Sequence, residues 1–379
     1  MRILIATDVP RQREAGTAGV LFNHAHELRK RGHDVECWFL EEMMDPGAWP
    51  KRFVTLRFAF LVAKRIMKAP TKYDVVNLHG ATGCLYGIWR KLRRKETPPY
   101  VFTMHGLIER YAYVMRREHR KGRAWNFSWK NRLWHRAYHQ GIFSCAIRTA
   151  DYGVSCNREG WTYPELVHDR DPNRLWYVPN GVEEVFFQER EYAEKALVRL
   201  LYVGTWLDRK GIYYLADAFR SLILKGVPVE LTVAGCGGSE PSVRDFFAPE
   251  VRGHVRVIPF VKREDMPGVY AEHDIFVFAS LMEGLPLSLL EAMAAGMPVV
   301  TTYNSGMADV VEDGFNGLTV LTADTDSLVE GIERLCGSVE LRKQLGLEAA
   351  RTMRRYTWEH VTGRLEKVLT LAVRQGARQ

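Results

Sequence analysis

The chain has 379 residues, of which 46% are hydrophobic and 26% charged, with a formal net charge of +8 at neutral pH. This composition excludes a disordered or low-complexity chain, and the length exceeds what one ordinary core serves, so we expect two folded domains. No stretch reaches the ~20 uninterrupted apolar residues of a membrane-spanning helix. The start, "MRILIATDVP", has too short an apolar run for a secretory signal, which predicts a cytoplasmic protein.

Positive charge is concentrated in the first half of the chain. Residues 1–185 contain 31 Lys and Arg against 19 Asp and Glu, a net charge of +12, and the remainder carries −4. Such asymmetry indicates an anionic partner for the first half, which would be nucleic acid, an anionic membrane or a phosphorylated acceptor.

In the first half, short β-rich apolar runs alternate with helical patterns, which predicts a parallel sheet with crossover helices. The helix after the first strand is expected to end at Gly32, because three basic residues before that glycine complement the negative end of the helix dipole. The predicted strands are residues 2–7, 34–40, 74–79, 100–105, 151–155 and 174–179.

The second half repeats this alternation and predicts a second α/β domain. A turn signal at Asn180-Gly181 precedes a charged stretch, so we place the boundary near residue 188, with domains at 1–188 and 189–379. Because ligands of doubly wound sheets lie at the carboxyl ends of strands, the loops after the strands are the candidate sites. The predicted strands of this half are residues 199–204, 229–235, 255–260, 274–280 and 298–303.

Two glutamates flank the start of an apolar helix in "MEGLPLSLLEAMAAGMPVV". Glu283 is expected in the loop after strand 274–280, and Glu291 just over one turn into a helix that runs from near Pro286 to Gly296. The amides of the intervening turn favour a phosphate, and the carboxylates can accept hydrogen bonds from sugar hydroxyls. A nucleotide sugar offers both groups. The alternative is a chance spacing of two solvated acids.

This arrangement resembles the Glu-x7-Glu signature of retaining glycosyltransferases of the GT-B fold, family 4. Three further motifs resemble that family in the same order: "VPNGVEE", "VGTWLDRKGIYYLADAF" and "NSGMADVVEDGFNGLTV". The resemblance extends over nearly the whole chain. It implies two Rossmann-like doubly wound domains facing a central cleft, with the acceptor on the first domain, the nucleotide-sugar donor on the second, and a last helix that returns to the first.

The resemblance also implies the residues of the donor site. Glu291 would hold the ribose hydroxyls, and Glu283 would lie beside the donor sugar, next to the turn formed by Gly284, Leu285 and Pro286. The remaining donor-site residues would be Arg209, Lys210, Gly16 and Gly19.

Arg209 and Lys210 would neutralise the diphosphate, since fixed cations stabilise the charge of the leaving group without a metal. Many relatives carry Arg directly after the glycine of "VG", whereas this chain has Thr205, so we expect Arg209 to supply that second charge. The alternative for Arg209-Lys210 alone is a solvated turn.

The first half supplies two glycines and one histidine to the implied site. Gly16 and Gly19, in "REAGTAGV", are expected in a loop that faces the diphosphate, where glycine permits close backbone approach. His105, in "FTMHG" at a strand end, resembles the family histidine near the reacting sugar and joins Glu283 and Lys210 as a catalytic candidate with a positioning or polarising role. His79, in "VNLHG", has the same setting. The alternatives are a tight turn and structural histidines.

No metal or other cofactor is expected. The triplet Asp169-Arg170-Asp171 leads into Pro172 and a turn, and Asp326 in a second triplet is interpreted as a helix N-cap, which argues against a metal-dependent GT-A enzyme. The six cysteines lack metal-ligand spacing, so we expect reduced thiols.

Three basic stretches account for the charge of the first half. They are residues 90–96, the cation-aromatic run 110–136, and a helical face formed by Arg57, Lys64 and Lys68. Each could be only a solvated face, yet a cation-aromatic mixture also suits an anionic membrane or another interface.

The sequence therefore predicts a retaining glycosyltransferase that moves a sugar from a nucleoside diphosphate to a hydroxyl of an acceptor. The expected acceptor is a glycan or glycolipid of cell-surface polysaccharide or glycoconjugate synthesis, met at an anionic membrane surface, with no nucleic-acid partner. The alternatives are a sugar-nucleotide epimerase of the same fold and a basic nucleic-acid-binding protein.

Overall fold

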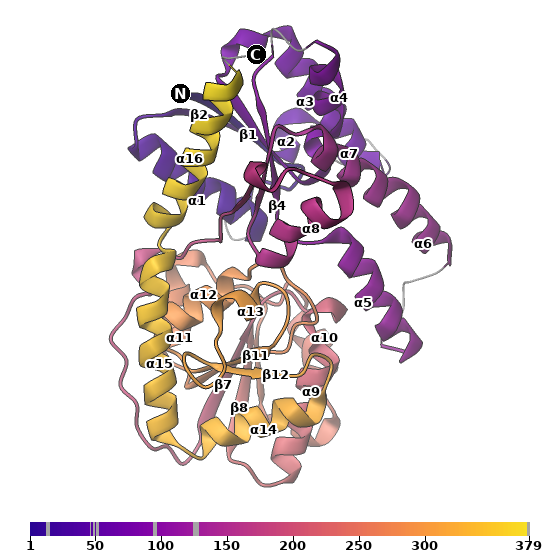
Figure 1. Cartoon of the computed structure of the whole chain (residues 1–379). Helices are drawn as coiled ribbons and strands as arrows, with labels where there is room; N and C mark the ends of the chain where they lie inside the picture. Colours follow the sequence, from indigo (N-terminus) through magenta and orange to yellow (C-terminus); the bar gives the residue numbers. More distant parts are fainter. Residues whose placement is uncertain are drawn as a thin grey trace. The chain divides into compact units, whose positions relative to one another are not determined.

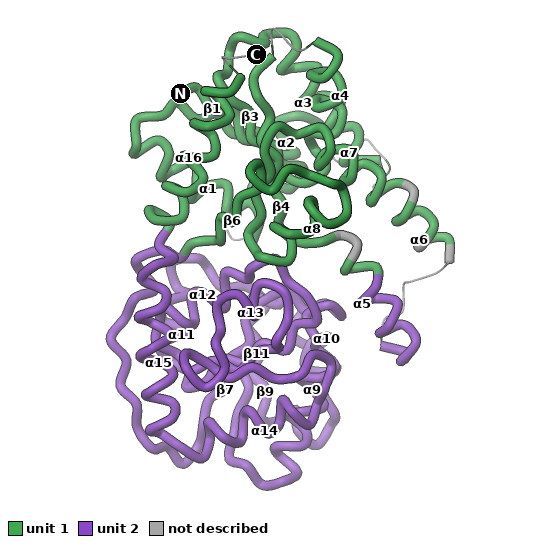
Figure 2. The backbone as a smooth tube through the Cα atoms, viewed as in Figure 1, with its two compact units in different colours: residues 1–112, 128–181, 358–379 green, residues 113–127, 182–357 purple. Residues whose placement is uncertain are grey.

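A computed structural model describes residues 1–12, 16–45, 47, 50, 53–93, 97–123 and 129–376. The chain forms two compact units, each built from more than one segment (Figure 2). Unit 1 comprises Met1–Ala112, Ser128–Gly181 and Trp358–Gln379, and unit 2 comprises Tyr113–Phe127 and Val182–Thr357. We expected the division near residue 188, but it falls at Gly181, because the amide of Val182 already bonds the carbonyl of Tyr356 in unit 2 at 2.8 Å.

Unit 1 contains a six-stranded parallel sheet in the order β2-β1-β3-β4-β5-β6. Figure 1 labels β1, β2 and β4 of this sheet. Each strand lies within a run predicted from the sequence. The strands are β1 (Arg2–Ala6), β2 (Asp34–Trp38), β3 (Val75–His79), β4 (Tyr100–Met104), β5 (Tyr152–Ser155) and β6 (Leu175–Tyr177). Helix α5 (Ile108–Arg120) begins in unit 1 and ends in unit 2. The other helices of unit 1 are α1 (Gly16–Lys30), α2 (Leu40–Met43), α3 (Val54–Lys68), α4 (Cys84–Leu92), α6 (Trp129–Trp134), α7 (Gly141–Thr149), α8 (Arg158–His168) and the last helix, α16 (Trp358–Gly376). Shorter turns are η3 (Pro70–Lys72), η4 (Gly80–Gly83), the π-helical η5 (His135–Gln140) and η6 (Pro172–Arg174).

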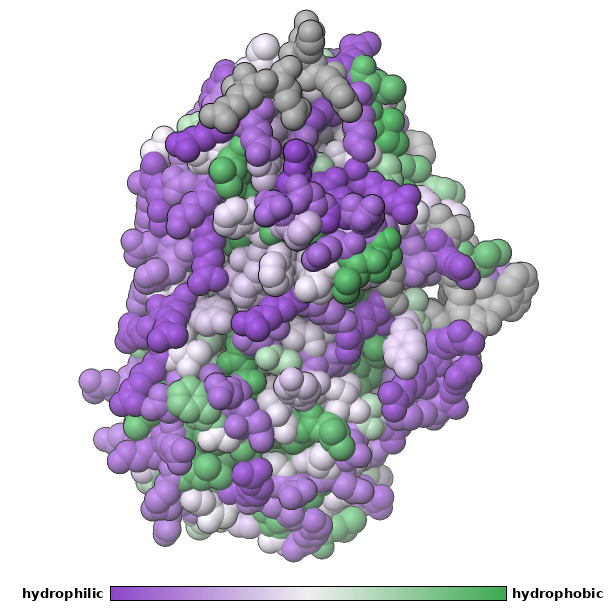
Figure 3. Space-filling model, viewed as in Figure 1, coloured by the Kyte–Doolittle hydropathy of each residue, from purple (hydrophilic) through white to green (hydrophobic). Residues whose placement is uncertain are grey.

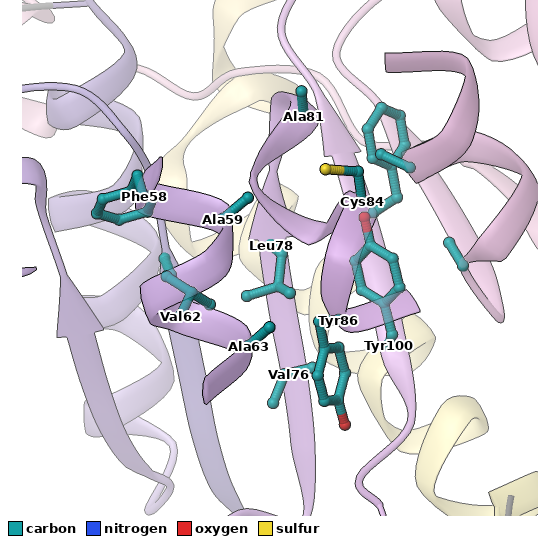
Figure 4. Packing of buried hydrophobic residues seen from close by; sticks show 14 of the residues in the cluster. Phe58, Ala59, Val62, Ala63, Val76, Leu78, Ala81, Cys84, Tyr86 and Tyr100 are labelled. Atoms are coloured by element: carbon teal, nitrogen blue, oxygen red, sulfur yellow. The ribbon is translucent and has the colours of Figure 1, made fainter. Parts of the chain in front are cut away.

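Alternate residues of the unit 1 strands point to opposite faces of the sheet and bury two apolar clusters. On one face, Val76 and Leu78 of β3 pack with α3, η4, α4 and α7, as the close view of Figure 4 shows for Phe58, Val62 and Tyr86. On the other face, the sheet packs against α1 and α16 through Leu21, Leu28, Leu365 and Leu369, among others. Helix α16, the last element of the described chain, therefore packs into the apolar core of unit 1.

The segment that contains Gly16 and Gly19 is helical, which corrects one prediction. Gly16 and Gly19 were expected in a loop, but Gly16 is the first residue of α1 and Gly19 is buried within its first turn. The apolar stripe of α1 explains this, because Ala18, Leu21 and later residues at helical spacing are buried, so the periodic pattern already begins before Gly19. The predicted helix end is confirmed, since Gly32 adopts φ +84° just after Lys30.

Unit 2 contains a second six-stranded parallel sheet, in the order β12-β11-β10-β7-β8-β9. The strands are β7 (Val198–Val203), β8 (Val229–Ala234), β9 (Val255–Ile258), β10 (Ile275–Phe278), β11 (Val299–Thr302) and β12 (Leu318–Val320). The sequence predicted the first five. It missed β12, whose three residues at the sheet edge are too short to show a periodic pattern. The α/β class with two doubly wound sheets is confirmed.

The helices of unit 2 are α9 (Ile212–Leu224), α10 (Glu240–Arg244), α11 (Met266–Ala271), α12 (Leu287–Ala294), α13 (Met307–Val310), α14 (Thr325–Cys336) and α15 (Val339–Met353). Its 3-10 turns are η7 (Glu184–Phe186), η8 (Asp208–Lys210), η9 (Pro249–His254), η10 (Arg263–Asp265) and η11 (Arg354–Tyr356).

The end of α5 is held in unit 2 by contacts with α9. The carboxylate of Glu118, only 2% exposed, accepts a hydrogen bond from the Tyr214 hydroxyl at 2.8 Å. Arg123 pairs with Asp217 at 2.9 Å and lies 4.5 Å from the centre of the Tyr214 ring. Part of the basic run 110–136 therefore stabilises unit 2 itself, a role that we did not predict from the sequence.

Candidate active site

Three loops meet at the carboxyl edge of the unit 2 sheet. Strands β7 and β10 are neighbours, and β10 also pairs with β11, so the segments that follow them lie side by side. The amide of Leu281, after β10, bonds the carbonyl of Arg209, after β7, at 2.9 Å. Gly211 makes this approach possible, because it adopts φ +71° and a Cβ there would lie 1.9 Å from the carbonyl oxygen of Ala279.

Glu283 is the acceptor on which these loops converge. Its carboxylate contacts Lys210 Nζ at 2.7 Å and Arg209 Nη1 at 3.2 Å, and the hydroxyl of Ser280 donates to it at 2.8 Å. The side chains of Glu283 and Lys210 are 9% and 11% exposed. The sequence predicted that Arg209, Lys210 and Glu283 belong to one site, and the structure brings the three together.

Electrostatics keep Glu283 ionised although it is buried. Burial by itself would raise the pKa of the Glu283 carboxyl, but the charges of Lys210 and Arg209, with the hydrogen bonds of Lys210 and Ser280, lower the pKa below its ordinary value. Burial lowers the pKa of Lys210, and the charge of Glu283 opposes that shift. The site therefore holds two cations against one anion, which leaves it able to take further negative charge.

The loop after β11 supports the loop that carries Glu283. The Asn304 amide donates to the carbonyl of Leu281, and the Thr302 hydroxyl donates to the carbonyl of Ser280 at 2.5 Å. A Cβ on Gly306 would lie 1.8 Å from the carbonyl oxygen of Gly284. These supporting side chains were not predicted as site residues, although the "NSG" that contains Asn304 and Gly306 belongs to a motif noted in the sequence.

Helix α12 begins one residue later than expected. We predicted Pro286 in the first helical turn, but it is the N-cap, with ψ 125°, and the helix proper starts at Leu287. Gly284 and Leu285 lie in the turn before it, as predicted. The positive end of the α12 dipole therefore points toward the Glu283 loop, where a phosphate would be stabilised.

Glu291 is buried against a cation that the sequence did not identify. It is 3% exposed, and its carboxylate bonds Arg263 Nη1 at 2.5 Å and the Tyr270 hydroxyl at 2.8 Å. Arg263 also contacts Glu183 of the "VPNGVEE" turn at 3.1 Å. Burial would lower the pKa of Arg263, but its two glutamates raise it. Arg263 gave no sequence signal, because it lies in a short 3-10 turn within an ordinary charged segment.

Thr205 follows Gly204 at the end of β7 and is exposed. Arg209, which we expected from the sequence to supply the second positive charge, contacts the same Glu283 carboxylate as Lys210. The two cations are adjacent in sequence yet contact the same carboxylate, because the η8 turn and Gly211 fold the backbone tightly there.

Two histidines meet at the carboxyl edge of the unit 1 sheet. His79 ends β3 and His105 directly follows β4, its neighbouring strand. His79 Nδ1 lies 2.7 Å from His105 Nε2, and His79 Nε2 lies 3.0 Å from the side-chain oxygen of Asn77. Burial lowers the pKa of His105 to about 4 and holds the pKa of His79 well below its ordinary value, so both rings are neutral at pH 7.

The basic stretches of unit 1 divide into structural and exposed residues. Arg90 is buried, pairs with Asp151 at 2.8 Å and donates to the carbonyl of Pro98, so it is a structural residue. Lys91 and Arg93 are exposed, and residues 94–96 lie outside the described ranges. On α3, Lys64 and Lys68 are exposed whereas Arg57 is half-buried over the Phe60 ring. Residues 124–128 of the run 110–136 also lie outside the described ranges.

The Asp-x-Asp triplets serve as caps. Asp171 caps η6 and accepts from the amide of Asn173. Asp324, rather than the predicted Asp326, caps α14 through the amide of Ser327, because Asp326 already lies in the first helical turn. Within the described ranges, no three His, Cys, Asp or Glu side chains are grouped closely enough to hold a metal ion. None of the six cysteines takes part in a disulfide in the structure.

Comparisons with known proteins agree with this architecture. Residues 15–185 match the family model described as Glycosyltransferase Family 4, and residues 198–338 match the model described as Glycosyl transferases group 1. An uncharacterized glycosyltransferase of Methanocaldococcus jannaschii is 26% identical over 82% of this chain and 78% of its own length. The UDP-Gal:alpha-D-GlcNAc-diphosphoundecaprenol alpha-1,3-galactosyltransferase of Escherichia coli is 25% identical over 70% of this chain and 66% of its own.

Among solved structures, the sucrose-phosphate synthase of Thermosynechococcus elongatus covers 100% of both chains with a TM-score of 0.77 at 17% identity, a likeness of fold. The two family models fall on the two halves of the chain, one for each predicted domain, and the motifs noted in the sequence lie within or beside them. The chain belongs to the glycosyltransferases of the GT-B fold.

Proposed function

We propose that this glycosyltransferase moves a sugar, with retention at the anomeric carbon, from a nucleoside diphosphate to a hydroxyl of a glycan or glycolipid. The observation that carries the proposal is the convergence of Lys210 and Arg209 on the single buried carboxylate of Glu283, beside the N-terminus of α12. The two cations and the positive end of the helix dipole can stabilise a diphosphate, which gains negative charge as it leaves.

In the proposed reaction, the bond between the anomeric carbon and the diphosphate oxygen breaks, and a bond to the acceptor oxygen forms on the same face of the sugar. The acceptor proton passes to the departing diphosphate. Lys210 and Arg209 stabilise the growing charge of that group, and Glu283 fixes the positions of both cations. Glu291 accepts the ribose hydroxyls with the lone pairs that Arg263 and Tyr270 leave available. No metal ion takes part.

The test is a transfer assay with the full chain and a panel of UDP- and GDP-sugars, using a short-chain polyprenyl diphosphate glycan as the acceptor. The anomeric proton coupling in the product is measured by NMR. We expect the product to keep the anomeric configuration of the donor. Inversion would contradict the retaining mechanism, and release of an epimerised sugar without use of the acceptor would identify an epimerase instead.

We further propose that unit 1 binds the surface of an anionic membrane, where a lipid-linked acceptor would be found. Helices α3 and α4 pack together; Lys64, Lys68 and Lys91 on them are exposed, as is Arg93 just after α4, and Leu92 between the last two is 78% exposed. Cations beside an exposed apolar side chain suit an interfacial surface. None of the described helices is both long and apolar enough to cross a bilayer, and apolar side chains form only small separate patches on the face drawn in Figure 3.

Vesicle co-sedimentation tests the membrane proposal with phosphatidylcholine vesicles, with and without phosphatidylglycerol, across a salt series. Each cation near the surface should contribute ~1 kcal/mol, and the attraction should weaken as salt shortens the Debye length. The variant Lys64→Ser/Lys68→Ser should bind the anionic vesicles less. The matched control Arg334→Ser/Lys343→Ser removes two exposed cations from unit 2 and should bind normally. Equal binding to both vesicle types at every salt concentration would contradict the proposal.

A further inference from the structure

Four polar side chains form a hydrogen-bonded chain at the carboxyl edge of the unit 1 sheet. Asn77 and His79 come from β3, Thr103 comes from β4, and His105 follows β4. The chain runs from Thr103 to Asn77 at 2.7 Å, from Asn77 to His79 at 3.0 Å, and from His79 to His105 at 2.7 Å. Asn77 and His79 are 0% and 3% exposed, and His105 is half-buried at the outer end.

The orientation of the Asn77 amide is fixed by a backbone acceptor. Its nitrogen lies 3.1 Å from the carbonyl oxygen of Val101, which can only accept a hydrogen bond. The same nitrogen also donates to Thr103 Oγ1 at 2.7 Å, so both of its hydrogens are used. The Asn77 oxygen therefore faces His79, because a flipped amide would set two acceptors against each other at Val101.

This orientation determines which nitrogen of each histidine carries the proton. The Asn77 oxygen accepts, so His79 Nε2 must be the N–H that donates to it. The buried His79 ring is neutral, so its Nδ1 is a lone pair and can only accept. His105 Nε2 must then be the N–H that donates to it at 2.7 Å. The neutral His105 ring consequently presents Nδ1 as a lone pair, for which the described residues supply no donor.

We propose that Asn77 and His79 are positioning residues that hold His105 in the Nε2–H tautomer, so that its Nδ1 accepts a hydrogen bond from a substrate hydroxyl. The inference rests on the proposed function for the identity of that substrate. It assigns His105 the role of an uncharged acceptor, in contrast to an imidazolium that would donate from both nitrogens. The hydroxyl that His105 recognises must have its proton free to donate, so a substrate methylated at that oxygen would be rejected.

Two substitutions of His79 separate this role from simple packing. A glutamine side chain can accept a hydrogen bond from His105 with its oxygen and donate one to Asn77 with its nitrogen. The variant His79→Gln therefore keeps both hydrogen bonds in the same direction. His79→Leu fills the same buried space but removes the acceptor that holds His105 Nε2–H. We expect His79→Gln to retain kcat within about threefold, and His79→Leu to lower kcat about tenfold with little change in the KM of the nucleotide sugar.

The tautomer itself is measured without substrate. Long-range 1H–15N correlation spectra of the full chain, with 15N-labelled histidine, report which ring nitrogens are protonated, and His79→Gln and His105→Gln spectra assign the signals. At pH 7 we expect protonated Nε2 and unprotonated Nδ1 for both His79 and His105. In His79→Leu, the His105 ring should become a mixture of tautomers.

A His105 ring protonated at Nδ1 in the unsubstituted chain would overturn the inference. So would a His79→Leu protein that is well folded by its amide spectrum, has a mixed His105 tautomer and turns over at the full rate. Failure of the unsubstituted chain to transfer any sugar would instead overturn the proposed function, and it would leave the tautomer result standing as a separate finding.

Discussion

The carboxyl edges of the two sheets occupy the same position in the same kind of fold, yet they carry opposite chemistry. In unit 2 this edge holds buried ions, with Lys210 and Arg209 paired to Glu283. In unit 1 it holds the neutral rings of His79 and His105, although the first half of the chain carries a net charge of +12. A doubly wound sheet therefore fixes where a ligand binds but not which kind of group is recognised there.

The difference follows from what each edge would have to stabilise. A leaving diphosphate gains negative charge, and cations that are already in place stabilise it without reorganisation. An acceptor or sugar hydroxyl changes its charge less, and a neutral imidazole can accept a hydrogen bond from it. The positive charge of unit 1 lies instead on exposed residues such as Lys64 and Lys68, away from the histidine pair in sequence and on a different element.

The largest effect is expected when the charge of Lys210 is removed. In Lys210→Ala, the leaving diphosphate loses its most buried cation and Glu283 keeps only Arg209. We expect kcat to fall by about 10² to 10³, in the range seen when one fixed stabilising donor is removed. Steady-state kinetics measure this, with the exposed Lys225→Ala at the end of α9 as the control. Turnover within a few-fold of the unsubstituted enzyme would mean that Lys210 does not stabilise the leaving group.

A smaller effect is expected at the second glutamate. Glu291→Gln removes the charge-assisted hydrogen bonds to ribose, so the affinity for the nucleoside diphosphate should fall by roughly 1.5 to 3 kcal/mol. Titration calorimetry with the free nucleotide measures the loss. Glu183→Gln is the matched control, because it removes the other partner of Arg263 and leaves α12 intact. Equal losses in both variants would show that the Arg263 pair, rather than a ribose contact, explains the effect.

Acid is expected to destabilise unit 1 through its buried histidines. Burial lowers the pKa of His24 to about 3 and that of His105 to about 4, from an ordinary value of 6.5. The unfolded chain therefore binds more protons than the folded chain below pH 6.5, and the free energy of unfolding decreases as the pH falls from 6.5 toward 4. Each such histidine contributes a slope of up to about 1.4 kcal/mol per pH unit.

Urea unfolding at several pH values measures this slope. The variant His24→Asn removes one buried imidazole and should reduce the slope between pH 6.5 and 4, although its stability at pH 7 can also be lower. A slope that is unchanged in this variant would mean that His24 is not the group that titrates.

The smallest effect is expected from removal of metal ions. Because the charge of the leaving group is assigned to Lys210, Arg209 and the α12 dipole, treatment with EDTA should leave the transfer rate unchanged within error. A loss of activity that Mg²⁺ or Mn²⁺ restores would contradict a donor site that works by side-chain cations alone.

Sequence patterns located most of the strands and the two cations of the loop after β7, and the reasons are local. Buried parallel strands appear as continuous apolar runs, and Lys210 and Glu283 lie in the loops that follow two of these runs. Arg263 was missed because its role arises only when η10, the Glu183 turn and α12 come together in the fold. The hydrogen bonds that link Asn77, His79 and His105 could not be predicted either, because their direction depends on a backbone carbonyl of the neighbouring strand.

The central claim is that the diphosphate of a nucleotide sugar binds the charged edge of unit 2. Hydrogen–deuterium exchange of the full chain, with and without the sugar nucleotide that gives the largest thermal shift, tests it most directly. We expect slower exchange in residues 204–211 and 280–291, and the same protection by the free nucleoside diphosphate. Unchanged exchange in both segments, with protection elsewhere in the chain, would contradict it.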